Sequence, residues 1–211
     1  MPQAQDHGEK GEPPLKPTSF ALLAFGANLT SPAGAPEMTL RAALELLKIK
    51  GAVIRAISAF YSTPAFPAGN GPDYVNAAAK ITVPWSAAQM LEICHEIEAE
   101  MGRTRTARWG QRTLDMDLIA MEDQVLPDRQ THKDWRDLPL DDQMIRIPGE
   151  LILPHPRLQD RAFVLVPLAD VAPDWIHPVL GSSVTQMRDA LDPADLATVR
   201  PLTTQMQNND L

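Results

Sequence analysis

The chain has 211 residues, of which 44% are hydrophobic and 22% are charged, and its formal net charge at pH 7 is -8. This length suits one sizeable core, and the acidic balance argues against a general nucleic-acid binder, which needs surplus lysine and arginine facing phosphates. No apolar run reaches the ~18 residues that span a bilayer, so we expect no membrane partner. The single cysteine, Cys94, excludes an internal disulfide and favours a cytoplasmic location.

The predicted elements start after an N-terminal tail. Residues 1–19 are rich in proline, glycine and charge, so we expect a disordered tail followed by a single domain over residues 20–211. The short apolar run Phe20–Gly26 predicts a central strand. Leucine and alanine at three- and four-residue intervals after Pro36 predict a helix that stops at Gly51.

The middle of the chain predicts two strands and a helix. A β-rich composition indicates a strand at Val53–Tyr61, and alternation indicates another at Tyr74–Val83, in which Tyr74 and Asn76 share one face. The stretch TPAFPAGNGPD between them holds three prolines and two glycines, which predicts an irregular loop. A capping-box pattern and an apolar stripe predict a helix at Ser86–Met101.

The last third predicts one more strand, at Thr113–Met121, and a short helix near Ser183–Leu191. Residues 127–150 show many charges and no periodicity, which indicates a surface insertion. The order β-α-β, loop, β-α-β then predicts an α+β fold, a ferredoxin-like sandwich with a mainly antiparallel sheet and flanking helices. Many functions share that fold, so the function has to come from particular residues.

Two carboxylates, Asp115 and Asp117, stand inside the last predicted strand, where β-propensity disfavours them. Alternation places Leu114, Met116 and Leu118 on the opposite face, so the two carboxylates lie side by side with Cα atoms about 6–7 Å apart. Unpaired, they would raise each other's pKa, and a divalent cation such as Mg²⁺ removes that cost. The alternative is that they face solvent or pair with nearby arginines.

Four arginines precede this pair within ten residues: Arg103, Arg105, Arg108 and Arg112. The guanidinium fork binds phosphate oxygens through charge-assisted hydrogen bonds. At ~0.15 M salt, charges beyond about 8 Å are largely screened, so this local cluster outweighs the net acidity of the chain. A solvated arginine face is the alternative, but arginines followed directly by paired carboxylates are typical of a magnesium-polyphosphate site.

Other phosphate-binding signatures are missing from the sequence. It contains no G-x-x-x-x-G-K-[ST] loop and no G-x-G-x-x-G, which excludes the P-loop and the dinucleotide-binding fold. His155 lies between two prolines in the segment LPHPR. It is either a phosphate contact or a structural histidine of a rigid loop.

The motifs FGANL, FYSTPAF, DYVNAA, GRTRTARWGQRTLDMDLI and LPHPRLQDRAFVLVPL follow one another between Phe20 and Pro173. With these motifs the chain resembles the 6-hydroxymethyl-7,8-dihydropterin pyrophosphokinase family of folate biosynthesis. The resemblance implies a ferredoxin-like fold and transfer of pyrophosphate from ATP to the hydroxymethyl group of the dihydropterin, with release of AMP. Gln111 departs from the proline that the family usually has at this place.

The resemblance also implies a role for each matching residue. Asp115 and Asp117 would hold two Mg²⁺ ions, and Arg103 and Arg112 would act with them in catalysis. The residues implied to bind ATP are Glu98, Arg105, Arg108, His155 and Arg161. The residues implied to bind the pterin are Thr63, Pro64, Phe66, Tyr74, Asn76, Trp109 and Phe163.

Two readings compete with this one. An RNA-binding ferredoxin-like module would use the arginine loop and Tyr74, but the acidic charge and the paired aspartates weigh against it. Another magnesium-dependent nucleotidyl- or phosphotransferase on the same fold is the second. The expected partners are the small molecules ATP and hydroxymethyl dihydropterin, with no nucleic acid and no membrane, and the expected assembly is a monomer.

Overall fold

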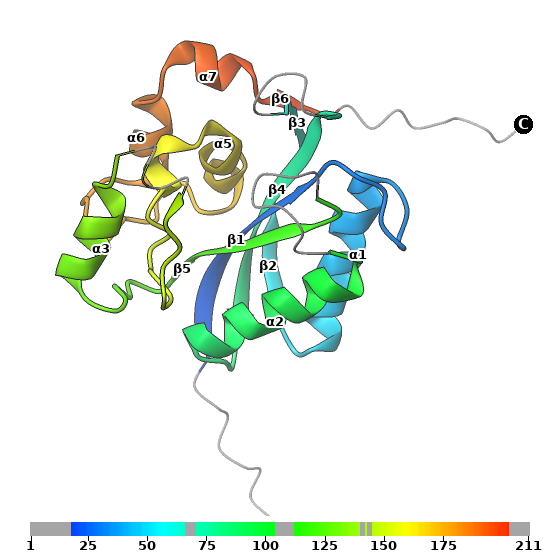
Figure 1. Cartoon of the computed structure of the whole chain (residues 1–211), viewed down its shortest axis with the longest axis horizontal. Helices are drawn as coiled ribbons and strands as arrows, with labels where there is room; N and C mark the ends of the chain where they lie inside the picture. The colour runs from blue at the N-terminus through cyan, green and yellow to red at the C-terminus, as the bar shows by residue number, and fades with distance from the viewer. Residues whose placement is uncertain (1–17, 66–70, 104–111, 140–141, 143–144, 203–211) are drawn as a thin grey trace, which may run out of the picture.

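Strand β1 (Ser19–Ala27) lies at the centre of the sheet, as its apolar sequence predicts. It pairs antiparallel with β4 (Tyr74–Val83) on one side and with β5 (Asp115–Met121) on the other. The computed structural model describes residues 18–65, 71–103, 112–139, 142 and 145–202. Within these residues the sheet has six strands in the order β5-β1-β4-β3-β6, and β2 also pairs with β4 (Figure 1).

The remaining elements have the following bounds. The other strands are β2 (Val53–Ile57), β3 (Tyr61–Thr63) and β6 (Arg200–Pro201). The helices are α1 (Pro36–Ile49), α2 (Ala87–Glu100), α3 (Arg129–Arg136), α5 (Ala162–Val171), α6 (Val184–Asp189) and α7 (Pro193–Ala197), with a 3₁₀ turn at Leu158–Asp160. None of the described helices combines the length and the apolar character needed to cross a bilayer.

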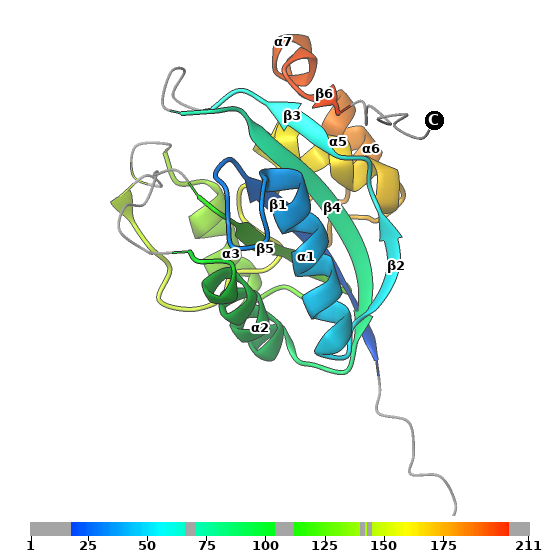
Figure 2. The ribbon, with the colours of Figure 1, turned by 90° about the vertical axis from the view of Figure 1, so that its right-hand side faces the viewer.

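The sheet separates two cores. Helices α1 and α2 cover one face, where Phe25, Leu47 and Ile97 are buried together, and α5 covers the other face, where Leu22 packs with Leu168 (Figure 2). The predicted α+β class, with a mainly antiparallel sheet and flanking helices, is therefore confirmed. The predicted capping box at the start of α2 is present as well.

The single strand predicted at Val53–Tyr61 is wrong, because the chain forms β2 and β3 with a break between them. At the break Ser58 Oγ accepts a hydrogen bond from Ala78 N at 2.9 Å, and Ala59 N donates to the Asp170 carboxylate at 3.1 Å. The Tyr61 hydroxyl donates to the same carboxylate at 2.8 Å. Asp170 lies on α5, far along the chain, so local composition gave no sign of the break.

Several elements of the C-terminal half carry no clear periodicity. Helix α3 lies inside the segment 127–150, and its N-cap Asp128 accepts hydrogen bonds from Gln130 N and Thr131 N. Helix α5 reads as an apolar run with Pro167 inside it. The helix predicted near residues 183–191 is confirmed as α6. The tail predicted for residues 1–19 lies outside the described residues up to residue 17, and Ser19 already belongs to β1.

Candidate active site

Asp115 and Asp117 lie next to each other on β5, on the sheet face that α5 covers. Their partners across the ladder are Gly26 and Ala24 of β1, whereas Met116 and Leu118 enter the core beneath α1 and α2. The predicted alternation of this strand is therefore confirmed. Its local cause is the period of two in an extended chain, which turns every second side chain to the same face.

Two arginines hold the two carboxylate oxygens of Asp115. Arg103 Nη1 lies 2.7 Å from Asp115 Oδ1, and Arg112 Nη1 pairs with Asp115 Oδ2. Arg161 Nη1 lies 3.8 Å from Asp117 Oδ2, so a third guanidinium stands beside the second aspartate. The site thus gathers at least three cations around two carboxylates, all of them partly accessible to solvent.

Glu98 ties the end of α2 to this cluster. Its side chain is 3% exposed, pairs with Arg103, and accepts a hydrogen bond from Met116 N at 2.8 Å. Burial raises the pKa of Glu98 to about 7, against the opposing effects of the Met116 N–H and of the Arg103 charge. Glu98 therefore fixes both Arg103 and the first residues of β5 around Asp115.

Asn28 is a site residue that sequence reasoning missed. Its side chain is 3% exposed, accepts a hydrogen bond from Arg112 N at 2.9 Å, and donates one to Pro72 O at 3.1 Å. It thereby joins the turn after β1 to Arg112 and to the segment before β4. The only signal in the sequence is an asparagine directly after a buried strand.

A neutral polar group lies two strands away on the same face. Asn76 of β4 stands opposite Gly26, and its Nδ2 donates to Thr63 Oγ1 at 2.8 Å in a buried contact. A Cβ on Gly26 would come within 3.3 Å of Asn76 Oδ1, so glycine leaves this place in the sheet open. Burial raises the pKa of Tyr74, and the opposing influence of Arg112 shows that this ring lies near the arginines.

His155, Arg161 and Phe163 complete the described part of the site. Burial, together with the Arg161 charge, lowers the pKa of His155 to about 3, so its imidazole is neutral. Its Nδ1 accepts a hydrogen bond from Arg157 N at 3.1 Å, which places the ring proton on Nε2 as a donor. The Arg161 guanidinium carbon lies 5.6 Å from the centre of the Phe163 ring, which is 41% exposed and offers a flat apolar face.

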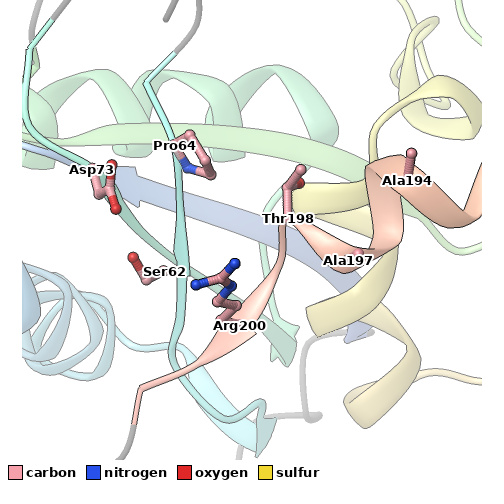
Figure 3. Close-up of a pocket in the computed structure, with 7 residues that line it drawn as sticks. All are labelled: Ser62, Pro64, Asp73, Ala194, Ala197, Thr198 and Arg200. Atoms are coloured by element: carbon pink, nitrogen blue, oxygen red, sulfur yellow. The ribbon is translucent and has the colours of Figure 1, made fainter. Parts of the chain in front are cut away.

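Not every predicted site residue lies with this group. Pro64 is exposed and borders a cavity of about 320 Å³ beside Ser62, Thr198 and Arg200, on the outer edge of the sheet (Figure 3). Strands β1 and β4 separate that edge from β5, a distance of about 14 Å. The predicted residues Phe66, Arg105, Arg108 and Trp109, like Gln111, lie outside the described residues.

Asp115 and Asp117 suit a magnesium site in which a substrate supplies the remaining ligands. Burial and the charge of Asp117 raise the pKa of Asp115, although Arg112 and Arg103 oppose this. In the part of the chain that the structure describes, no three acidic, histidine or cysteine side chains converge as a metal site. Mg²⁺ is commonly held by one or two carboxylates together with substrate phosphates, so the pair fits Mg²⁺ bound with a polyphosphate.

Comparison with known proteins identifies the family. The family model described as 7,8-dihydro-6-hydroxymethylpterin-pyrophosphokinase matches residues 22–173. The chain belongs to this family. The expectation of a pyrophosphokinase of folate biosynthesis is thereby confirmed, and it replaces the RNA-binding alternative.

Relatives in this pyrophosphokinase family match most of the chain. Proteins named 2-amino-4-hydroxy-6-hydroxymethyldihydropteridine pyrophosphokinase occur in Synechocystis sp. (33% identical, 89% of this chain, 87% of the relative) and Methylorubrum extorquens (33%, 85% and 98%). The wild-type HPPK-DHPS crystal structure of Plasmodium falciparum matches with a TM-score of 0.57 at 17% identity. It shares the fold over 82% of this chain, which corresponds to 44% of that longer protein.

Proposed function

We propose that this pyrophosphokinase takes its pyrophosphoryl group from ATP, with the site on β5 as the place of transfer. The hydroxymethyl oxygen of the dihydropterin attacks the β-phosphorus in line, the bond from that phosphorus to the α-β bridging oxygen breaks, and AMP leaves with that oxygen. The hydroxyl proton passes to solvent. The observation that supports this proposal is a pair of carboxylates surrounded by three arginines. These residues are Asp115, Asp117, Arg103, Arg112 and Arg161.

The arginines neutralise charge on the transferred group. Arg103 and Arg112 hold Asp115 between them, and a guanidinium carries five N–H groups that suit phosphate oxygens. Charge that develops on the β-phosphoryl oxygens and on the leaving α-phosphate then meets fixed cations. Because Glu98 and Asn28 anchor Arg103 and the Arg112 backbone, little reorganisation is needed when the phosphates bind.

In this proposal Asp115 and Asp117 hold Mg²⁺, two ions in total, together with the ATP phosphates. The bound metal supplies Lewis-acid polarisation of phosphoryl oxygens. The aspartates lose their mutual repulsion when they bind it, which fits the raised pKa of Asp115. Glu98 is engaged by Arg103 and by Met116 N, so we assign it no role as a general base, and positioning and charge neutralisation provide most of the rate enhancement.

The nucleotide and the pterin occupy different parts of the sheet face. Arg161 and the neutral Nε2–H of His155 contact ATP, and Glu98 acts by holding Arg103; Arg105 and Arg108 remain predicted ATP ligands. Asn76 and Thr63 bind the amide and amino edge of the pterin, and Tyr74 and Phe163 offer aromatic faces. Pro64, Phe66 and Trp109 remain predicted pterin contacts. Two strand spacings, about 10 Å, separate Asn76 from Asp115.

Product identity tests this proposal. The enzyme is incubated with ATP, Mg²⁺ and 6-hydroxymethyl-7,8-dihydropterin, and nucleotides and pterins are separated by chromatography. AMP and a pterin diphosphate should form in equal amounts. Formation of ADP would indicate a different phosphotransferase, and ATP consumption that does not depend on the pterin would contradict the proposal.

The proposal also covers the setting of the enzyme. A single cysteine and two small-molecule substrates are consistent with a monomeric enzyme of the cytoplasm. Light scattering after size-exclusion chromatography tests the first point. A mass of about twice the 23.2 kDa of one chain would contradict it.

A further inference from the structure

A histidine from the segment 127–150 supports the loop that carries His155. His132 of α3 is fully buried, and its Nε2 lies 3.0 Å from Pro154 O. A carbonyl only accepts hydrogen bonds, so Nε2 carries the proton and donates it. This hydrogen bond joins α3 to the residue directly before His155.

Backbone hydrogen bonds hold the residues on both sides of Pro154. His155 N donates to Ile119 O of β5 at 2.8 Å, and Leu153 forms a two-way backbone bridge with Leu126. Together, these contacts fix the backbone at Leu153 and at His155. The His132 ring fixes the Pro154 carbonyl between them. A loop held at three successive residues presents the neutral Nε2–H of His155 in one place.

A second histidine fixes the ring of His132. His177 is fully buried and packs edge-on against His132 with 5.7 Å between ring centres. His177 Nδ1 accepts hydrogen bonds from Val179 N and Leu180 N, which locks its own orientation. His177 follows residue 173, where the family match ends, so the support comes partly from a segment beyond that match.

We propose that His132 is a positioning residue for nucleotide binding: through the Pro154 carbonyl it holds the loop that presents His155 to ATP. This inference rests on the proposed contact between His155 and the nucleotide. It gives the segment 127–150 a role in the reaction, since this segment supplies the donor. Loss of the donor leaves the Pro154 carbonyl buried without a partner, and the loop shifts to find one.

The test compares two substitutions of His132 by steady-state kinetics. His132→Leu keeps a buried apolar side chain and removes the donor, and it should raise KM for ATP about tenfold while KM for the pterin stays within twofold. His132→Gln places an amide donor near the position of Nε2, and it should keep KM for ATP within threefold of wild type. If His132→Leu does not fold, His132→Asn replaces it, because its shorter amide does not reach the carbonyl.

Two further variants separate positioning from general stability. Leu47→Ala, in the core beneath α1, should lower the melting temperature while both KM values stay within twofold. His155→Ala should raise KM for ATP, and His132→Leu added to it should cause less than a further twofold change, because both act through one contact.

Each contrary outcome has its own meaning. An equal rise of both KM values in His132→Leu, an unchanged KM for ATP, or full additivity with His155→Ala would overturn the inference and leave the ATP contact standing. An unchanged KM for ATP in His155→Ala would overturn that contact and the inference with it. The AMP assay above still decides the reaction in that case.

Discussion

The two ends of β5 bury polar groups in opposite ways. At its N-terminal end, the Asp115 carboxyl group pairs with Arg103 and Arg112, and Arg103 also pairs with Glu98. Beyond its C-terminal half, which binds His155 through Ile119 O, the rings of His132 and His177 are buried with lowered pKa values and are neutral. The charged end therefore depends on cationic partners, and the histidine end depends on staying unprotonated.

The largest effect is expected at the charged end. Asp117→Asn removes one of the two adjacent carboxylates and should lower kcat at least a hundredfold, because the proposed Mg²⁺ ligand is lost. Steady-state AMP release measures this, and circular dichroism checks the fold. Asp123→Asn makes the same charge change on the exposed turn after β5 and should leave kcat within twofold. A change confined to KM in Asp117→Asn would contradict a transition-state role.

The free energy of unfolding should fall in acid because of the buried histidines near the C-terminal end of β5. Burial lowers the pKa of His177 to about 4, whereas an unfolded histidine titrates near 6.5. Above pH 6.5 the His177 ring is neutral in both the folded and the unfolded protein. As the pH falls from 6.5 to 4, only the unfolded state takes up the proton, so the free energy of unfolding should fall by about 3 kcal/mol for this group.

Urea denaturation at several pH values measures that slope. His177→Asn keeps an acceptor near the position of Nδ1 and does not titrate, so its stability should fall less steeply below pH 6.5. An acid slope equal to that of the wild type would show that His177 is already protonated or exposed in the folded protein.

A neutral group on the same face as the aspartates should give a smaller and more selective effect. Asn76→Ala removes the proposed edge partner of the pterin and the donor to Thr63, and it should raise KM for the pterin about tenfold with KM for ATP within twofold. Thr82→Ala, farther along β4, is the control. Equal changes in both KM values would mean that Asn76 only supports the sheet.

The smallest effect is expected at Gly26 of β1, which lies between Asp115 of β5 and Asn76 of β4. A Cβ there comes within 3.3 Å of Asn76 Oδ1, and the Asn76 amide has to shift by a few tenths of an ångström. Gly26→Ala should therefore raise KM for the pterin about threefold. A larger effect on KM for ATP would indicate that the added methyl group disturbs Asp115 instead.

Elements with a local pattern were predictable from the sequence, and elements fixed by distant partners were not. The apolar run of β1, the capping box of α2 and the alternation of β5 each encode their own structure. The break after β2 depends on Asp170, more than a hundred residues later. Helix α5 is buried widely enough that its apolar run shows no helical stripe.

The same distinction holds for the site. The shared face of Asp115 and Asp117 follows from strand geometry, but no periodicity shows that Asn28 reaches Arg112 and Pro72. Likewise, His132 reads as one more polar residue in a charged segment. Its hydrogen bond to Pro154 O, 22 residues later, is a tertiary contact that no local pattern encodes.

Strand β6 sets a limit on the order in which the molecule is completed. Arg200 and Pro201 pair with β3, and Leu202 N donates to Phe60 O at 2.7 Å (Figure 1). During synthesis from the N-terminus, Thr63 and Asn76 leave the ribosome long before the strand that closes this edge. The nascent chain therefore carries an open sheet edge along β3 until residues 200–202 have left the ribosome.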